Sequence, residues 1–311
     1  MKKYLLSISA VTAMLAMTSV FTACSSDDDE QKSLTHGTLI LDADKSNYAD
    51  VDESGTRALA VDGTTIKTYW DKDKDKVTVF ASNWKNSLGT LTPQPDKVPA
   101  GSPEYRTKLE GPITYSNLKV GDALNLIFPR PEWQYTGQKG TIEDISENFD
   151  YITTDISVVY IDPNTTGNPV YSTTALFGKA QQAIVKFTLL NGDGSALQLP
   201  DNPELSITTA SNQLVTKCNL DGTAAEKGGA LIIKKENSSN EFYVAIRNNN
   251  EDKDQYTLSI KDKNGKFLTY TKSDITFARG DYKKINVKMK FYDQTYTERV
   301  SYDDQGEETW E

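Results

Sequence analysis

The sequence predicts an all-β protein built of antiparallel β-sandwiches. Short runs of β-branched and aromatic residues recur along its 311 residues. Turn residues separate these runs at hairpin spacing, as at residues 191–194, 221–222 and 263–266. Helical periodicity is nearly absent, since only residues 142–149 and 175–183 carry enough pattern for a turn or two of helix. Many short strands with this spacing are typical of sandwiches rather than of parallel sheets.

The expected strands follow one another along most of the chain. The first covers residues 37–43 (Gly-Thr-Leu-Ile-Leu-Asp-Ala). Residues 44–63 are rich in Asp, Ser, Gly and Ala and are expected to form an exposed loop. The later strands are expected at residues 77–80, 123–128, 156–161, 183–190, 205–208, 230–233, 242–246, 256–260 and 284–289.

Changes in composition predict four segments. Residues 1–23 form a signal peptide, and residues 24–34 form an acidic tether without apolar periodicity. Residues 35–178 form a loop-rich N-terminal β-sandwich domain. Residues 179–311 form a C-terminal β-sandwich domain with denser hairpins and cleaner alternation.

The beginning of the chain resembles a bacterial lipoprotein precursor. Two lysines precede an uncharged apolar stretch, which ends at Cys24 and is followed at once by Ser-Ser-Asp-Asp-Asp-Glu. In such precursors the cysteine becomes the first mature residue and carries acyl chains such as palmitate. The acidic run looks like the tag that sends lipoproteins of Bacteroidetes to the outer face of the outer membrane. Phe21 departs from this pattern, because it stands where leucine is usual. An uncleaved membrane helix is the alternative, but the stretch is barely long enough and has no basic flank after it.

Charge and cysteine content exclude several classes of protein. The formal net charge is −10, and lysines alternate finely with acids, so we expect no nucleic-acid partner. Apart from Cys24 the chain has one cysteine, Cys218, so no intramolecular disulfide is expected after lipidation. Cys218 alternates with its neighbours as a strand residue does. We therefore expect a small buried hydrophobic side chain there rather than a reactive thiol.

The residues do not form a recognisable catalytic or metal site. The single histidine, His36, precedes the first strand, is expected to be solvated and has no Gly-x-Ser-x-Gly motif to accompany it. Residues 71–75 (Asp-Lys-Asp-Lys-Asp) begin like a calcium loop, but Lys76 replaces its glycine and Ser82 its glutamate. We read them as a solvated turn. Paired carboxylates of a glycosidase type stay open, because an acidic protein contains many pairs and nothing singles one out. We expect no enzyme activity, no cofactor and no metal.

Aromatic residues suggest one binding alternative. Trp70, Trp84, Trp133 and the many tyrosines could line a glycan-binding face, since aromatic rings stack on sugars. The same residues are favoured in strands and fill sandwich cores. Exposed, coplanar tryptophans would favour the glycan-binding alternative.

Several segments together resemble the fimbrillin family of Bacteroidetes, whose members form type V pili. They are residues 127–129 (Ile-Phe-Pro), 135–141 (Tyr-Thr-Gly-Gln-Lys-Gly-Thr), 149–151 (Phe-Asp-Tyr), 177–180 (Phe-Gly-Lys-Ala) and 279–287, the last similar to the family's final core strand. The resemblance spreads over most of the mature chain. It implies two transthyretin-like β-sandwiches in tandem, export as a lipoprotein and assembly into surface pili.

The resemblance also implies a processing site and a donor strand. In structural subunits of the family an arginine-specific protease cuts in the loop after the first strand, which leaves a groove for a strand of the next subunit. The matching bond here lies between Arg57 and Ala58. Residues 291–302 are the candidate donor, because their apolar side chains, Tyr292, Tyr296, Val300 and Tyr302, share one face of an extended strand. Alternatively, Arg57 is an ordinary surface residue and this segment is an edge strand of its own domain.

These observations predict a structural subunit of a fimbria that supports adhesion. Its expected partners are other pilus subunits, in a homo- or heteropolymer, the arginine-specific protease, and the outer membrane through the lipid on Cys24. Two alternatives stay open. One is an anchor subunit that keeps its lipid and first strand, and the other is a surface lipoprotein that binds glycans.

Overall fold

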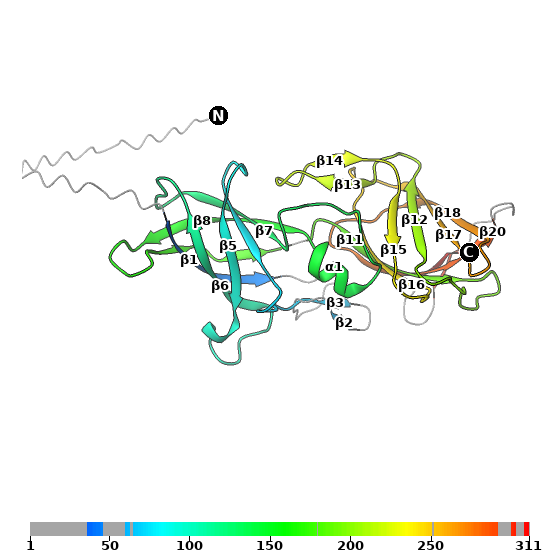
Figure 1. Cartoon of the computed structure of the whole chain (residues 1–311), viewed down its shortest axis with the longest axis horizontal. Helices are drawn as coiled ribbons and strands as arrows, with labels where there is room; N and C mark the ends of the chain where they lie inside the picture. Colours follow the sequence, from blue (N-terminus) through cyan, green and yellow to red (C-terminus); the bar gives the residue numbers. More distant parts are fainter. Residues whose placement is uncertain are drawn as a thin grey trace, which may run out of the picture. The chain divides into compact units, whose positions relative to one another are not determined.

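Strands make up almost all of the regular structure. The computed structural model describes residues 36–45, 60–62, 65–178, 180–250, 252–291, 300–302 and 308–310 (Figure 1). Within these ranges there is one α-helix, α1 (Ile142–Asn148), and no helix has the length and apolar character needed to cross a membrane. The predicted all-β class is confirmed. The predicted signal peptide, Cys24 and the Arg57–Ala58 bond lie outside the described residues.

The first large sheet contains the strands of the N-terminal half. Their hydrogen-bonded order is β10-β1-β6-β5-β4-β7-β8-β9, and β1 also pairs with β9. This extra pairing closes seven of the strands into a ring. The bounds are β1 (His36–Lys45), β4 (Val77–Ala81), β5 (Ser87–Gln94), β6 (Arg106–Thr114), β7 (Ala123–Phe128), β8 (Ile152–Ile161), β9 (Pro169–Ser172) and β10 (Ala175–Phe177). A separate hairpin joins β2 (Ala60–Asp62) to β3 (Thr65–Lys67).

Two expectations for this half need correction. Instead of the expected pair of open sheets, the strands form a closed, barrel-like sheet, because β1 bonds to β6 along one edge and to β9 along the other. Residues 175–177 are strand β10 rather than the start of a helix over 175–183. Ala175 and Phe177 are buried whereas Leu176 is exposed, which is the two-residue period of a strand. The transthyretin-like description of the two halves stays a prediction.

The C-terminal half contains two five-stranded sheets. Their orders are β16-β11-β19-β22-β21 and β15-β12-β17-β18-β20, with a separate hairpin of β13 and β14. Aromatic rings from the two sheets meet, since Trp310 on β22 stacks on Tyr270 of β18. The bounds are β11 (Ala183–Leu190), β12 (Glu204–Thr209), β13 (Val215–Cys218), β14 (Ala224–Lys227), β15 (Leu231–Lys234), β16 (Glu241–Ile246), β17 (Asp254–Lys261), β18 (Phe267–Ile275), β19 (Tyr282–Lys288), β20 (Lys290–Phe291), β21 (Val300–Tyr302) and β22 (Glu308–Trp310).

Residues 133–140 join the two sets of sheets. The buried Gln138 side chain donates to the carbonyl of Ala245 on β16 (2.9 Å) and accepts from its amide (2.7 Å). The Tyr135 amide donates to the carbonyl of Thr216 (2.9 Å). Gly140 has a φ of +72°, and a Cβ there would lie 3.0 Å from Ile233, so glycine suits this close approach. Most of the residues 135–141 that carry the family resemblance thus lie at this joint.

The predicted boundary at residue 178 falls between β10, which pairs with β1, and β11, which begins the next sheet. Buried apolar residues of both halves form one continuous core. The division into two domains stays a prediction.

Candidate functional site at the first strand

Strand β1 is held along both of its edges. Residues 36–44 pair antiparallel with residues 106–114 of β6. On the other edge, residues 38–40 pair in parallel with β9 and residues 43–45 pair in parallel with β10. β1 therefore fills a one-strand gap between β6 and the β9–β10 segment, and we call this gap the β1 seat.

The inward face of β1 is buried in the seat along its whole length. Gly37, Leu39, Leu41, Ala43 and Lys45 alternate along the strand and are all buried, with both leucines no more than 2% exposed. The outward face is polar apart from Ile40. There Asp44 makes two contacts with the Arg106 guanidinium (2.8 and 2.9 Å) in an exposed pair, which contributes little to stability.

Gly37 marks the beginning of the seat. A Cβ atom at this position would lie 2.4 Å from the carbonyl oxygen of Asn168 and 3.3 Å from the hydroxyl oxygen of Tyr115. A backbone oxygen at that distance cannot be avoided by a side-chain rotation. Nearby, the Thr38 amide donates to the Gly167 carbonyl (3.0 Å). Only glycine fits here without a backbone shift.

Lys45 marks the other end. Its side chain is 0% exposed, and its Nζ atom donates to the Asp75 carboxylate at 2.7 Å. The same Nζ lies 3.4 Å from the centroid of the Trp70 ring and 4.0 Å from that of Phe128. Trp70 in turn packs edge-on against Phe177 of β10. Lys45 thus occupies a cation site made of one carboxylate and two aromatic faces, which we call the Lys45 cage.

Asp75 corrects the expectation of a solvated turn at residues 71–75. Its side chain is 9% exposed, and besides Lys45 it accepts from the Asp71 amide at 3.1 Å. Asp71 itself accepts from the amides of Asp73 and Lys74 and closes the turn. The turn is present, but its last carboxylate points into the protein and not into solvent. Among the described residues, no cluster of three His, Cys, Asp or Glu side chains has the arrangement of a metal site.

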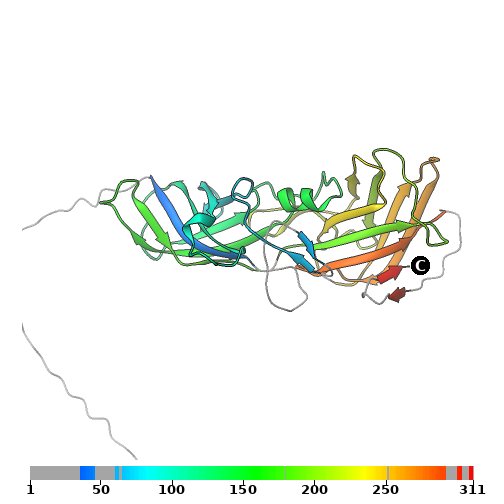
Figure 2. The same ribbon diagram turned by 90° about the horizontal axis from the view of Figure 1, so that it is seen from below.

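The predicted donor segment is only partly described. Tyr292 and Tyr296 lie outside the described residues. Val300 and Tyr302 are the ends of β21, which pairs antiparallel with β22 of the same chain. β22 pairs in parallel with residues 285–287 of β19 (Figure 2). The last strands of the chain are therefore bonded to the edge of its own C-terminal sheet, and the donor role stays a prediction.

Trp310 is a residue that the sequence reading missed. Its side chain is 0% exposed, although charged residues surround it in the sequence. Its ring contacts Phe187 at a centroid distance of 6.2 Å, Phe277 at 6.4 Å and Tyr270 at 6.1 Å. A tryptophan within an acidic C-terminal segment was the available signal. Trp310 fastens β22 to the core of the C-terminal half.

The tryptophans considered for glycan binding do not form a platform. Trp70 is 6% exposed and Trp133 is 2% exposed, and the Trp133 ring stacks on Tyr151. Trp84 is half-buried against Phe80. These rings are core residues, as the packing alternative predicted. Among the described residues, the exposed aromatic pair is Tyr160 on Tyr171, with ring centroids 6.0 Å apart.

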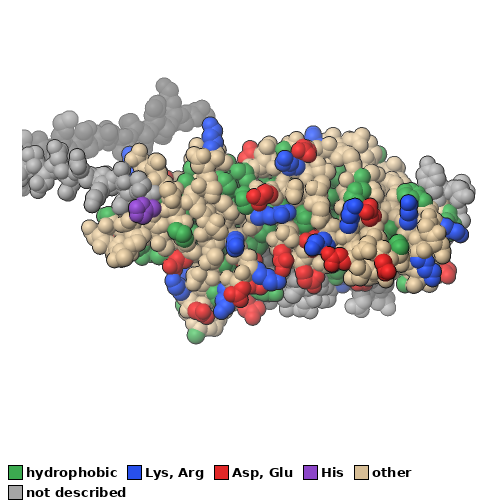
Figure 3. Space-filling model, in the orientation of Figure 1, with side chains coloured by type: hydrophobic (Ala, Val, Ile, Leu, Met, Phe, Trp, Pro, Cys, Tyr) green, Lys and Arg blue, Asp and Glu red, His purple; other side chains and the backbone are tan. Residues whose placement is uncertain are grey.

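Cys218 and His36 lie where their environments were predicted. Cys218 is 6% exposed and is a free thiol, and burial raises its pKa to about 11. The Arg247 guanidinium donates to its sulfur at 3.2 Å. His36 is exposed, as expected, but it is the first residue of β1 rather than part of a preceding loop (Figure 3).

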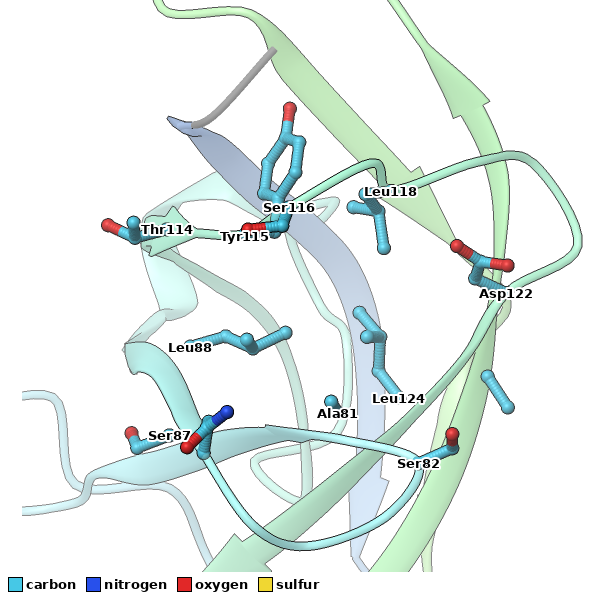
Figure 4. A pocket seen from close by; sticks show the side chains of 12 residues that line it. Ala81, Ser82, Ser87, Leu88, Thr114, Tyr115, Ser116, Leu118, Asp122 and Leu124 are labelled. Carbon is cyan, nitrogen blue, oxygen red and sulfur yellow. The ribbon is translucent and has the colours of Figure 1, made fainter. Parts of the chain in front are cut away.

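Another surface feature is a cleft in the first sheet. A cleft of about 490 Å³ lies at one end of the first sheet, where Leu88, Leu118 and Leu124 face one another (Figure 4). Asp122 is the charged side chain of its lining, and it accepts from the Lys119 amide at 2.8 Å. On the face in Figure 3, acidic and basic side chains are interspersed, as the sequence predicted.

Comparisons with known proteins give distant likenesses. No protein-family model matches the sequence, and no curated protein matches it. The structure is similar to a "putative cell adhesion protein" of Bacteroides uniformis, at 14% identity and a TM-score of 0.39, over 88% of this chain and 98% of that one. A fimbrial assembly protein of Parabacteroides distasonis has 12% identity and a TM-score of 0.38, over 89% and 99%. A shaft pilin of Lactobacillus rhamnosus has 11% identity and a TM-score of 0.30, over 81% and 96%.

Proposed function

We propose that this chain is a structural subunit of a cell-surface pilus that supports adhesion. It is exported as a lipoprotein precursor with its lipid on Cys24, and protease-triggered donor-strand exchange then polymerises it at the outer membrane. Other subunits and an arginine-specific protease are its partners. It has no enzyme activity and no cofactor in this role.

The observation that carries this proposal is the β1 seat. β1 ends at Lys45, and Arg57 follows 12 residues later in the sequence. Cleavage at Arg57 would cut the covalent link between β1 and the rest of the fold. Loss of β1 would then leave unpaired backbone groups on β6 and on the β9–β10 segment. It would also uncover the part of the apolar core against which Leu39, Leu41 and Ala43 pack, and we call this part the apolar floor of the seat. Such a gap is a template for addition of a strand.

Digestion of the purified chain tests this proposal. The protein starts at Ser25, and an Arg299→Lys substitution protects the tail from an arginine-specific protease. We expect cleavage after Arg57, release of the fragment that contains β1, and uptake of an added labelled peptide of residues 36–45 by the vacated seat. An Arg57→Ala chain is the matched control and should give neither release nor uptake. Cleavage and release without uptake of the peptide would refute strand exchange.

An anchor subunit is a second candidate, and the Lys45 cage favours it. A buried ion pair between β1 and Asp75 stabilises β1 in its seat, as an anchor that keeps its first strand requires. In the same digestion an anchor would keep the β1 fragment bound after cleavage, or would resist cleavage at Arg57. Release of the fragment within minutes would exclude this role.

A further inference from the structure

We propose that the β1 seat selects its incoming strand by a cation, and that the strand comes from a polypeptide other than a copy of this chain. This inference rests on the proposed strand exchange and names the partner that the exchange requires. The partner strand carries Lys or Arg at the position of Lys45 and glycine eight residues earlier, at the position of Gly37.

The cation requirement follows from the groups that stay when β1 leaves. Asp75 and Trp70 lie in the segment before β4, and Phe128 ends β7, so all of the Lys45 cage belongs to the remaining fold. Among the described residues, Lys45 is the basic residue whose side chain forms an ion pair with Asp75, and it leaves with β1. An incoming strand with an apolar residue at this register would leave the Asp75 carboxylate, which is 9% exposed, without its countercharge. Such burial is strongly unfavourable.

The glycine requirement acts at the opposite end. The carbonyl oxygen of Asn168 occupies the place of any Cβ at position 37. A strand in register with the Lys45 cage therefore needs glycine there. The two requirements fix the register of the strand, and two leucines and one alanine lie between them in the native sequence.

The tail of this chain does not meet these requirements. Aligning Arg299 with Lys45 places Phe291 on the glycine position, and it places Asp293, Thr295 and Thr297 on the apolar floor. The opposite direction places Ser301, Asp303 and Gln305 there. The apolar face of the tail, from Tyr292 to Tyr302, contains Glu298 and no cation. Charge complementarity thus favours a strand of another polypeptide.

A peptide-exchange experiment tests the inference. In the chain that starts at Ser25, residues 53–59 are replaced by the site of a sequence-specific protease, so that the test does not depend on cleavage at Arg57. The cleaved protein, with β1 still in place, is mixed with fluorescent peptides and the bound label is followed by anisotropy. The probes are the native sequence of residues 36–45, its Lys45→Arg, Lys45→Met and Gly37→Ala variants, and the tail sequence of residues 291–302.

We expect the Lys and Arg peptides to bind, and the Met peptide to bind on the order of 100-fold more weakly. The Gly37→Ala and tail peptides should also bind weakly. In an Asp75→Asn protein the preference for Lys over Met should fall to a few-fold; if that variant does not fold, the peptide series on the wild-type fold decides alone. Equal binding of all five peptides would overturn the inference and leave strand exchange intact. If even the native peptide does not enter, both proposals fail.

Discussion

The burial of Trp310 predicts that the end of the chain is a structural element of the C-terminal half. The test is a Trp310→Ala substitution. A buried tryptophan removes about 200 Å² from water, which at about 25 cal/mol per Å² corresponds to roughly 5 kcal/mol. The alanine retains a small part of this, and the tail can relax into the space. We therefore expect the free energy of unfolding to fall by about 3–5 kcal/mol.

Urea unfolding, followed by circular dichroism, measures this loss. The midpoint should fall without a large change in slope, and the melting temperature should fall by about 2–4 °C for each kcal/mol. Thr309→Ala is the matched control, because Thr309 lies on the same strand, is half-buried and contacts Asn286 only at 3.5 Å. It should cost less than about 1 kcal/mol. Trp310→Phe should recover part of the loss. A Trp310→Ala chain as stable as its Thr309→Ala control would refute the reasoning.

Three further predictions concern the β1 seat and the buried titratable groups. Gly37→Ala should lower the free energy of unfolding by about 1–3 kcal/mol, because the added Cβ would clash with the Asn168 carbonyl oxygen. Gly178→Ala is the control and should be nearly neutral, because the space around Gly178 is open. Equal unfolding curves for the two variants would contradict this. Lys45→Met should cost about 3–5 kcal/mol by leaving Asp75 unpaired, and adding Asp75→Asn should restore much of it; additive losses in urea unfolding would contradict coupling. Burial raises the pKa of Cys218 to about 11 and that of Tyr256 to about 12, so the protonated groups contribute their full stabilisation at pH values below their ordinary pKa. Urea titrations should show this contribution declining as the pH rises above about 9 and through the two folded-state pKa values. A Cys218→Ala chain should lose the part of this pH dependence that comes from the cysteine.

The sequence predicted strands best where alternation is strict. Residues 183–190 are β11 with the predicted bounds, because β-branched and aromatic residues alternate there between the core and the surface. The predicted helix at 142–149 is α1, and the Thr141 hydroxyl accepts from the Asp144 amide at its start. In these segments the local pattern and the tertiary environment agree.

Strands β5 and β6 show why other elements were missed. Both contain glycine and proline, which read as strand breakers in sequence. In the structure Gly89 and Gly111 are points of close approach between these two strands. A Cβ at either position would lie 2.1 Å from a backbone oxygen of the neighbouring strand. Glycine is required there by a partner that is distant in sequence, so local reasoning does not detect it.

The candidate site was predicted in outline but not in its chemistry. The position of the first strand and the exposure of His36 followed from the sequence. Lys45 and Asp75 are 30 residues apart, and each reads alone as a solvated charge in a polar segment. Their pairing becomes visible only when β1 and the turn before β4 are placed side by side. The same holds for Trp310, whose partner Phe187 lies in the first strand of the C-terminal half.

The two ends of the chain pose linked requirements for assembly. A donor segment that includes β21 must leave β22, which Trp310 holds in the core of its own chain. The stability lost in Trp310→Ala is therefore a lower limit on the free energy that this tail gives up when the whole segment, including β22, is released, because that release also breaks the pairing of β22 with β19. The seat at the other end requires a cation, which the apolar face of this tail lacks. Both observations disfavour self-polymerisation. The tail is stabilised by the C-terminal sheet of its own chain, and its side chains match the seat of an identical copy poorly. A strand that places a cation in the Lys45 cage, and that need not first be released from its own fold, would bind the seat more tightly than this tail. Assembly with a different subunit is therefore favoured over self-polymerisation.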